Sequence, residues 1–207
     1  MRIAIVSDIH GNLAALEAVR ADLRDASPDL VLHGGDLADS GPHPAEVVDC
    51  IRALGWPGVM GNTDEMLFRP EALEAFAATS RAPASVWATV RENAAAARAE
   101  LGAERLAWMA GLPRVMVREE LALVHAGPAD LWRAPDAKAA DEELVAVYGA
   151  LGAAVVVYGH IHVPFVRSMD GLMVANAGSV GLPFDGDPRA SYLLVEDGRA
   201  VIRRVEQ

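Results

Sequence analysis

The sequence of 207 residues predicts an α/β fold, a two-sheet α/β sandwich with helices on its outer faces. The first part of the chain repeats a strand–loop–helix pattern, which is typical of parallel strands with crossover helices. The last part turns to short apolar strands separated by Asp-Gly turns, which favour antiparallel hairpins. We expect a single domain over residues 1–207, in which residues 65–112 form a helical insertion or cap.

The first part contains three predicted strands, Arg2–Val6, Leu30–His33 and Pro57–Met60. Between the first two, Asn12 caps a helix in which Leu13, Leu16, Val19 and Leu23 recur at helical spacing. A second helix runs from Pro44 to Leu54, with proline in its first turn.

Residues 65–112 are rich in Ala, Glu and Arg and predict helices at Glu71–Ala77, Ser85–Glu100 and Glu104–Ala110. Gly102 and the Gly111-Leu112-Pro113 segment interrupt or end these helices.

The last part begins with a predicted hairpin of Val115–Arg118 and Leu121–His125, followed by a helix over Asp141–Ala150. Val155–Tyr158 is continuously apolar, as expected of a strand that is buried on both faces. The remaining predicted strands are Val163–Ser168, Leu172–Ala175, Ser191–Glu196 and Ala200–Val205.

Composition excludes several classes of function. The net charge of −11 leaves no basic face, so we expect no binding to DNA backbones. The longest apolar run, Ala150–Tyr158, is too short to cross a bilayer, and Met1–Val6 is too short for a signal peptide. The single cysteine, Cys50, rules out an intramolecular disulfide. We therefore expect a cytoplasmic protein without a membrane partner.

Side chains that can bind metals follow the predicted strands, each just beyond a strand's carboxyl end: Asp8, His10, Asp36, Asn62, Asp64, His125, His160 and His162. In open α/β sheets, ligands bind at this edge. Carboxylates, imidazoles and a carboxamide favour Mn, Fe, Zn, Co or Ni, whereas an all-oxygen set would favour Mg or Ca. The donors suffice for two ions, with Asp36 able to bridge them, and such pairs catalyse in-line displacement at phosphorus.

These residues stand in segments that resemble the five signature blocks of the calcineurin-like metallophosphoesterase family. The segments occur in order: Ser7-Asp8-Ile9-His10-Gly11-Asn12, Gly35-Asp36, Gly61-Asn62-Thr63-Asp64, His125 and Gly159-His160-Ile161-His162. Further segments resemble a compact bacterial phosphodiesterase subgroup: 41–44 with Glu46-Val47, 176–181 and 187–191.

The resemblance implies a two-sheet α/β/β/α sandwich and a dinuclear centre, with manganese as the first expectation. Asp8, His10, Asp36 and His162 would hold one ion, and Asp36, Asn62, His125 and His160 the other. A metal-bridging hydroxide would attack phosphorus. We assign catalytic roles to Asp36, Asn62, Asp64 and His125, and substrate contacts to Asn12 and Thr63.

Thr63 departs from the family pattern, in which a histidine that helps the leaving group often follows the asparagine. Threonine cannot usefully protonate an alkoxide at neutral pH, which favours good leaving groups and, in our interpretation, phosphodiesters. The residues Ala126 and Ala177 also depart from the pattern, but neither is a predicted ligand.

Purely structural roles are the alternative for some of these residues. Asp64 and Asn12 are also good helix caps, and His33 fits a buried structural histidine. Asn176 and Ser179 fit a turn under the site, and one of the four tryptophans could stack on a substrate base.

Two alternative functions remain open at this stage. One is a catalytically weak protein-binding scaffold. The other is a nucleotide-specific hydrolase of the dinucleoside polyphosphate type. The expected partner is a small phosphate ester, nucleotides included. The sequence is also compatible with a homo-oligomer.

Overall fold

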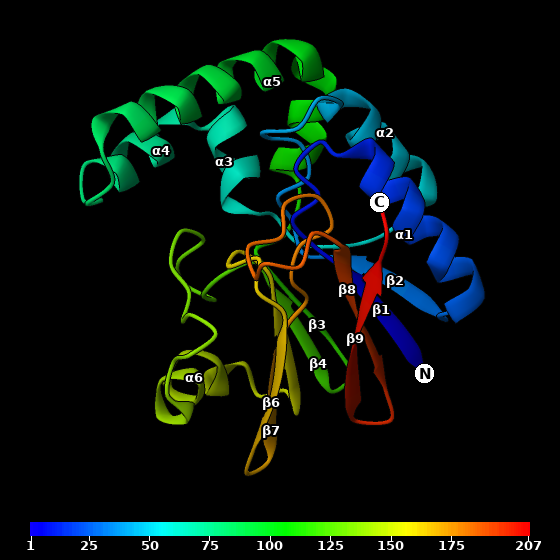
Figure 1. Cartoon of the computed structure of the whole chain (residues 1–207). Coiled ribbons are helices and arrows are strands. Elements are labelled where there is room, and N and C mark those ends of the chain that lie inside the picture. Colours follow the sequence, from blue (N-terminus) through cyan, green and yellow to red (C-terminus); the bar gives the residue numbers. More distant parts are fainter.

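Two β-sheets face each other in the computed structural model, which describes residues 1–207 (Figure 1). The first sheet has the order β2 (Leu30–His33), β1 (Arg2–Val6), β8 (Ala190–Glu196) and β9 (Arg199–Val205), with β1 and β2 parallel. The second has the order β3 (Val115–Arg118), β4 (Leu121–Val124), β5 (Val155–Tyr158), β7 (Leu172–Asn176) and β6 (Phe165–Met169). This arrangement confirms the predicted two-sheet α/β sandwich.

The core between the sheets is built by strand alternation. Ile3 and Ile5 of β1 pack in one apolar cluster with Leu121 and Leu123 of β4, whereas Ala4 and Val6 belong to a different cluster on the outer face of β1. Full burial of such a side chain contributes about 1.5–3 kcal/mol, so this alternation fixes which face of each strand meets the other sheet.

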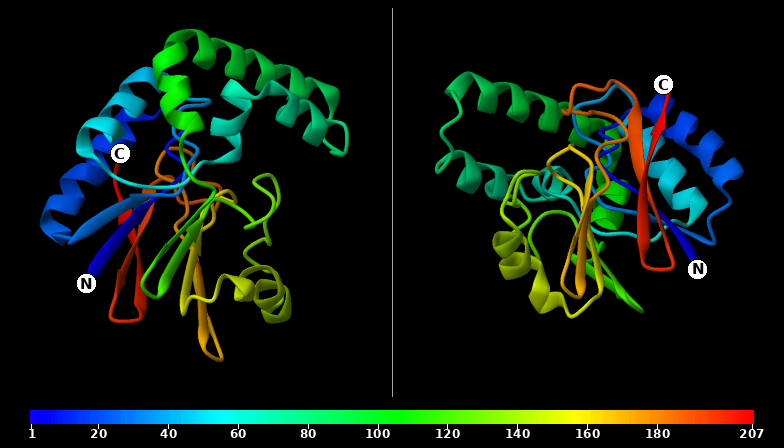
Figure 2. Two further views of the ribbon diagram at one scale, coloured as in Figure 1. Left: turned by 180° about the vertical axis from the view of Figure 1, so that it is seen from behind. Right: turned by 60° about the horizontal axis from the view of Figure 1, so that its bottom comes forward.

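Helices cover both outer faces. The helices α1 (Leu13–Ala26) and α2 (Pro44–Leu54) share an apolar cluster with the first sheet, while α6 (Asp141–Tyr148) and a short 3₁₀ turn (Gly149–Leu151) lie against the second. Figure 2 shows the same layers from behind and from below. Asn12 caps α1 as predicted, since its Oδ1 accepts a hydrogen bond from the Ala15 N–H at 3.0 Å.

Three helices lie together at the top of Figure 1: α3 (Asn62–Phe68), α4 (Pro70–Ala77) and α5 (Ala84–Ala110). Gly102, at φ 67° and ψ 172°, breaks α5 at the predicted position. Arg98 of α5 donates hydrogen bonds to the carbonyls of Leu67 and Met66, which ties this helix to the end of α3.

Two local predictions were wrong. The segment Pro57–Met60 forms only a single parallel bridge, between Gly58 and His33. It leaves the sheet at Met60, whose N–H donates to the Pro113 carbonyl instead of a strand. The helix α3 was not predicted, because its first residues carry polar side chains that resemble a turn. No helix of this chain has both the length and the apolar character needed to cross a membrane.

Candidate metal centre

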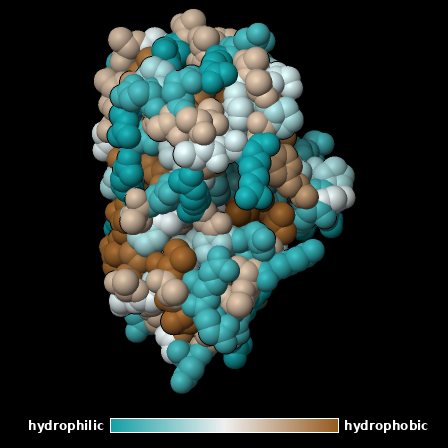
Figure 3. All heavy atoms as spheres, turned by 90° about the vertical axis from the view of Figure 1, so that its left-hand side faces the viewer, coloured by the Kyte–Doolittle hydropathy of each residue, from teal (hydrophilic) through white to brown (hydrophobic).

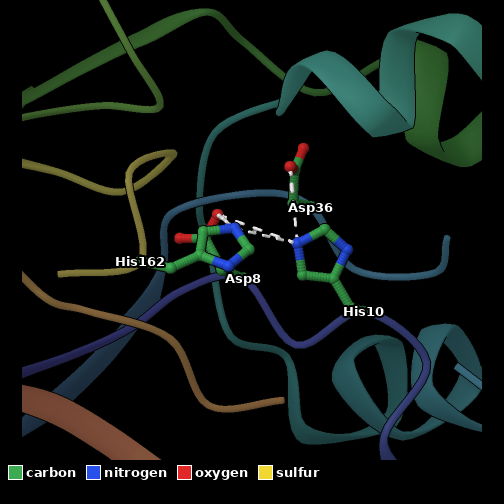
Figure 4. Close-up of side chains that lie close together, drawn as sticks. All are labelled: Asp8, His10, Asp36 and His162. Carbon is green, nitrogen blue, oxygen red and sulfur yellow. Dashed lines mark hydrogen bonds and ion pairs between the residues drawn. The ribbon is translucent and has the colours of Figure 1, made fainter. Parts of the chain in front are cut away.

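The predicted ligands converge where β1, β2, β4 and β5 end. Asp8 and His10 follow β1, Asp36 follows β2, His125 follows β4, and His160 and His162 follow β5. Asn62 joins them as the first residue of α3. The metal-capable atoms of Asp8, His10, Asp36 and His162 lie within 4.8 Å of one another, and Figure 4 shows the four side chains pointing inward.

Backbone conformation at the site is unusual. Asp8, His10, Asp36, His160 and His162 all have positive φ, between 50° and 67°. Non-glycine residues rarely occupy this region, which costs roughly 1–2 kcal/mol per residue. These five are among nine non-glycine residues with positive φ in the chain, so more than half of this strain falls on predicted ligands, which must be aimed from tight turns.

Main-chain hydrogen bonds hold the two strained loops beside each other. The N–H of Asp8 donates to the Gly35 carbonyl at 3.0 Å, that of His10 to the Asp36 carbonyl at 3.0 Å and that of Gly11 to the Leu37 carbonyl at 2.8 Å. The loops after β1 and β2 thus continue the pairing of the strands, which fixes the spacing of their side chains.

The first group of donors is compact. The Nε2 atom of His162 lies 3.1 Å from Oδ1 of Asp8 and 3.2 Å from Nε2 of His10. Oδ2 of Asp36 lies 3.7 Å from the same His10 nitrogen. All four side chains are buried.

The second group centres on Asn62. Its Oδ1 lies 2.9 Å from Nε2 of His125 and 2.9 Å from Nδ1 of His160. The other oxygen of Asp36, Oδ1, lies 3.4 Å from Nε2 of His125. The two oxygens of Asp36 therefore face the two groups separately.

Carbonyl groups orient three of the imidazoles. The Nδ1 atoms donate to backbone oxygens, from His10 to Asp39 at 3.1 Å, from His125 to Gly34 at 2.8 Å and from His162 to Leu182 at 2.6 Å. A histidine that binds a metal commonly donates its other N–H in this way. In each of these rings, when neutral, the Nε2 atom that faces the centre carries no proton and can accept a hydrogen bond or bind a metal.

The pKa shifts reflect this crowding. Burial alone would lower the pKa of His125, but Asp36 outweighs it and raises that pKa to about 10. In the same way, Asp8 outweighs the burial of His162 and raises its pKa. Burial lowers the pKa of His160 to about 4. The two buried carboxylates thus favour positive charge on the imidazoles beside them.

Asp64 touches no other candidate side chain but holds the loop that carries Asp36. Its carboxylate accepts hydrogen bonds from the N–H groups of Asp36 and Leu37, both at 2.9 Å, and of Gly61 at 3.0 Å. Burial and then the charge of Asp36 raise the pKa of Asp64 to about 7. Asp64 thus caps α3 and also fixes the backbone of Asp36.

The two residues predicted to contact substrate, Asn12 and Thr63, differ in their distance from the ligand group and in their hydrogen bonds. Asn12 is engaged in its cap and donates to the Gly181 carbonyl at 3.2 Å, outside the ligand group. Thr63 uses its N–H to hold Oδ1 of Asp36 at 2.9 Å, while its hydroxyl is buried without a hydrogen-bond partner.

Turn residues beneath the site behave as expected. Ser179 donates to the Asp8 carbonyl at 2.7 Å, and Asn176 donates to the Gly159 carbonyl at 2.5 Å. Sequence reasoning missed the Leu182 carbonyl that orients His162, and Phe184, whose ring stacks on the His162 ring with 4.4 Å between centroids. Both precede β8 in a loop whose path depends on tertiary packing.

The donor set suits a divalent metal. His10 and His162 each donate from Nδ1, so in their neutral forms two Nε2 acceptors face each other at 3.2 Å, which is unfavourable without a cation or proton between them. The same holds for Nε2 of His125 opposite Oδ1 of Asn62. Nitrogen and oxygen donors of this kind fit a transition-metal ion, and the Asp and His cluster can hold one.

Comparisons with known proteins agree with this chemistry. An uncharacterized protein of Methanocaldococcus jannaschii is 31% identical over 99% of this chain and 87% of its own length. The crystal structure of a metallophosphoesterase from Sphaerobacter thermophilus matches with a TM-score of 0.80 at 30% identity, covering 100% of this chain and 89% of the other. A hypothetical protein from Pyrococcus horikoshii matches with a TM-score of 0.85 at 17% identity, covering 99% and 88%.

The family assignment rests on a match along nearly the whole chain. Residues 1–198 match the model of the calcineurin-like phosphoesterase superfamily domain, a span that contains every candidate ligand described above. This chain therefore belongs to the calcineurin-like phosphoesterase superfamily.

Proposed function

We propose that this protein hydrolyses phosphodiesters with two divalent cations, manganese being the first expectation. The observation that carries the proposal is the convergence of oriented nitrogen and oxygen ligand atoms from four strand ends and one helix start. Buried acceptors that face one another are costly unless a cation lies among them.

Asp36 divides the donors into two sets. One set is Asp8, His10 and His162, and the other is Asn62, His125 and His160. The 3.7 Å approach of Asp36 Oδ2 to His10 and the 3.4 Å approach of Oδ1 to His125 support a shared, bridging carboxylate. We assign each set, together with Asp36, to one cation.

Bound divalent cations supply charge neutralisation at the phosphoryl oxygens and make water a better nucleophile at neutral pH. The protein's own part is positional. Asp64 fixes the backbone of Asp36 and Gly61, and the carbonyls of Gly34, Asp39 and Leu182 fix the imidazoles. The hydroxyl of Thr63, buried without a partner, is the group we assign to a phosphoryl oxygen.

The preference for diesters rests on what Thr63 lacks. Its hydroxyl has no useful acidity at neutral pH, so the departing alkoxide or phenolate must be a weak base or take its proton from water. Diesters meet this requirement more easily than monoesters with the same leaving group, because the loose transition state of a monoester places more negative charge on the departing oxygen.

A protein-binding scaffold is the competing proposal. Vacuolar protein sorting 29 proteins from Entamoeba histolytica and Cryptosporidium parvum share this fold at 17% and 16% identity. The complete donor set argues against it, because a scaffold has no use for buried, strained ligands.

The test compares hydrolysis of bis-p-nitrophenyl phosphate and p-nitrophenyl phosphate by purified protein, with added Mn²⁺ and after chelation. We expect metal-dependent release from both, faster from the diester. Equal rates would remove the diester preference. No release and no bound metal would refute the enzyme proposal and favour the scaffold.

A further inference from the structure

A cavity of about 300 Å³ opens beside the candidate metal centre, and nothing above assigns it a role. Its walls come from α3, from α4, from the segment before β3 and from the loop after β4. Figure 3 shows the side of the molecule on which α4 and α6 lie, where hydrophilic and apolar residues alternate without one extended apolar face. This side offers a place for a mixed polar and aromatic ligand.

The cavity adjoins the centre through two elements. Glu65, at its floor, lies on α3 three residues after Asn62, roughly 4.5 Å along the helix axis. The loop wall begins at Ala129, four residues after His125. Between them, the Gly127 N–H donates to the carbonyls of Asp130 and Arg133. A substrate with phosphorus at the centre could therefore extend one arm into the cavity.

The floor of the cavity is the buried carboxylate of Glu65, which positions two arginine side chains. Glu65 is only 2% exposed, and its side chain pairs with Arg114 at 2.5 Å and with Arg69 at 3.1 Å. The side chains of Arg114 and Arg69 remain 43% and 51% exposed. Each guanidinium has five N–H donors and Glu65 engages few of them, so donors remain for an anion.

Aromatic rings stand beside these cations. Glu65 also accepts a hydrogen bond from the indole N–H of Trp132 at 2.8 Å, which fixes the indole in the cavity wall. The Trp132 ring lies 5.1 Å from that of Phe76, and the guanidinium of Arg133 lies 5.1 Å above the Phe76 ring. One carboxylate therefore places both the flat apolar surface and the anion donors.

Three arginines (Arg69, Arg114 and Arg133) and two carboxylates (Glu65 and Asp130) line the cavity, so its walls carry a net positive charge. A positive site with aromatic walls selects a ligand that is both anionic and flat. A nucleotide has this combination, with a base to lie against the aromatic pair and a phosphate for Arg69 and Arg114.

We infer that this cavity binds the base of a nucleotide together with a phosphate that is not cleaved, while the scissile phosphorus of the same substrate lies at the adjoining metal centre. The kinetic part of this inference rests on the proposed function, whereas nucleotide binding in the cavity does not. The candidate substrates are then nucleotide esters, in preference to phosphate esters without a base.

The binding test titrates AMP into the intact protein without added metal, and isothermal titration calorimetry measures the Kd. Arg69→Met with Arg114→Met keeps the aliphatic stems and removes both charges, and we expect the Kd for AMP to rise at least about tenfold. Arg118→Met is the matched control, because Arg118 lines a separate cavity at the β3–β4 turn. It should leave the Kd unchanged.

The kinetic test compares two diesters with the same leaving group, thymidine 3′-phosphate 5′-(p-nitrophenyl phosphate), which carries a phosphate that is not cleaved, and bis-p-nitrophenyl phosphate. The double variant should raise KM for the thymidine ester about tenfold and leave that for the other ester within about twofold. Trp132→Phe, which keeps an aromatic ring but loses the bond to Glu65, should have a smaller effect in the same direction.

The outcomes separate the two proposals. If both esters are hydrolysed but AMP does not bind, the nucleotide role of the cavity is refuted and the proposed function stands. The same conclusion follows if the double variant changes KM equally for both esters. Binding of AMP that the double variant weakens, without hydrolysis of either ester, supports the cavity and contradicts the proposed function.

Discussion

The carboxylate of Asp64 accepts a hydrogen bond at 2.9 Å from the backbone N–H of Asp36, the residue whose side chain faces both groups of candidate ligands. Through its bonds to Leu37 and Gly61, Asp64 also joins the loop after β2 to the start of α3. Two signature segments that are far apart in sequence are thus fixed to each other by one buried side chain.

Asp64→Asn should weaken this junction, because the amide group would turn an N–H donor toward N–H donors. We expect metal affinity to fall about 10–100-fold and the free energy of unfolding to fall by about 2 kcal/mol. Calorimetry with Mn²⁺ and chemical unfolding measure these quantities. Asp49→Asn, at the exposed pair with Arg105, is the control and should change neither appreciably. Unchanged metal affinity in Asp64→Asn would contradict a positioning role.

Asp36→Ala should remove metal binding and hydrolysis together, because Asp36 is the carboxylate shared by both groups. Metal content and bis-p-nitrophenyl phosphate turnover report the two losses, and circular dichroism reports whether the fold persists. A variant that keeps full activity would show that the shared carboxylate is not required.

The hydroxyl of Thr63 gives a third prediction, because it is buried without a hydrogen-bond partner. Thr63→Val should raise the unfolding free energy by about 1 kcal/mol in the absence of substrate and lower kcat/KM about fivefold to tenfold. Thr89→Val on α5, where the hydroxyl bonds the Ser85 carbonyl, is the matched control. Unaltered kcat/KM in Thr63→Val would remove the proposed phosphate contact.

Acid should destabilise the protein partly through His33, whose ring nitrogens are buried without partners and whose pKa burial lowers to about 4. Because the folded-state pKa lies below the ordinary 6.5, this stability is complete above pH 6.5 and is lost as the pH falls towards about 4. The loss amounts to at most about 3 kcal/mol. Unfolding of the chelated protein across this range should be less pH-dependent for His33→Leu than for the wild type. His43→Gln, at a half-exposed site, is the control.

Metal binding itself should stabilise the fold. A ligand present at a thousand times its Kd adds about 4 kcal/mol to the unfolding free energy, so Mn²⁺ should raise Tm and chelation should reverse the rise. Four imidazoles among the candidate donors favour Mn²⁺, Zn²⁺ or Co²⁺ over Ca²⁺. A larger shift with Ca²⁺ than with Mn²⁺ would contradict the proposed donor set.

The sequence indicated most strands and helices because their periodicity is local, and it indicated the ligand group because polar residues follow strand ends. The strand predicted at Pro57–Met60 does not form, because the segment leaves the sheet and the Met60 N–H bonds the Pro113 carbonyl instead. Sequence reasoning also missed the cavity, since Glu65, Arg114 and Trp132 meet only after α3, β3 and the loop after β4 are packed together. Such contacts have no periodicity in the sequence.

The left-handed backbone at five candidate ligands has a consequence for evolution and engineering. At Asp8, His10, Asp36, His160 and His162, glycine would relax the main chain, so conformational preference opposes the residue that the chemistry requires. A lineage released from catalysis, or a library screened for thermal stability alone, should lose these side chains early. The metal centre would then disappear while the sheets that carry it remained intact.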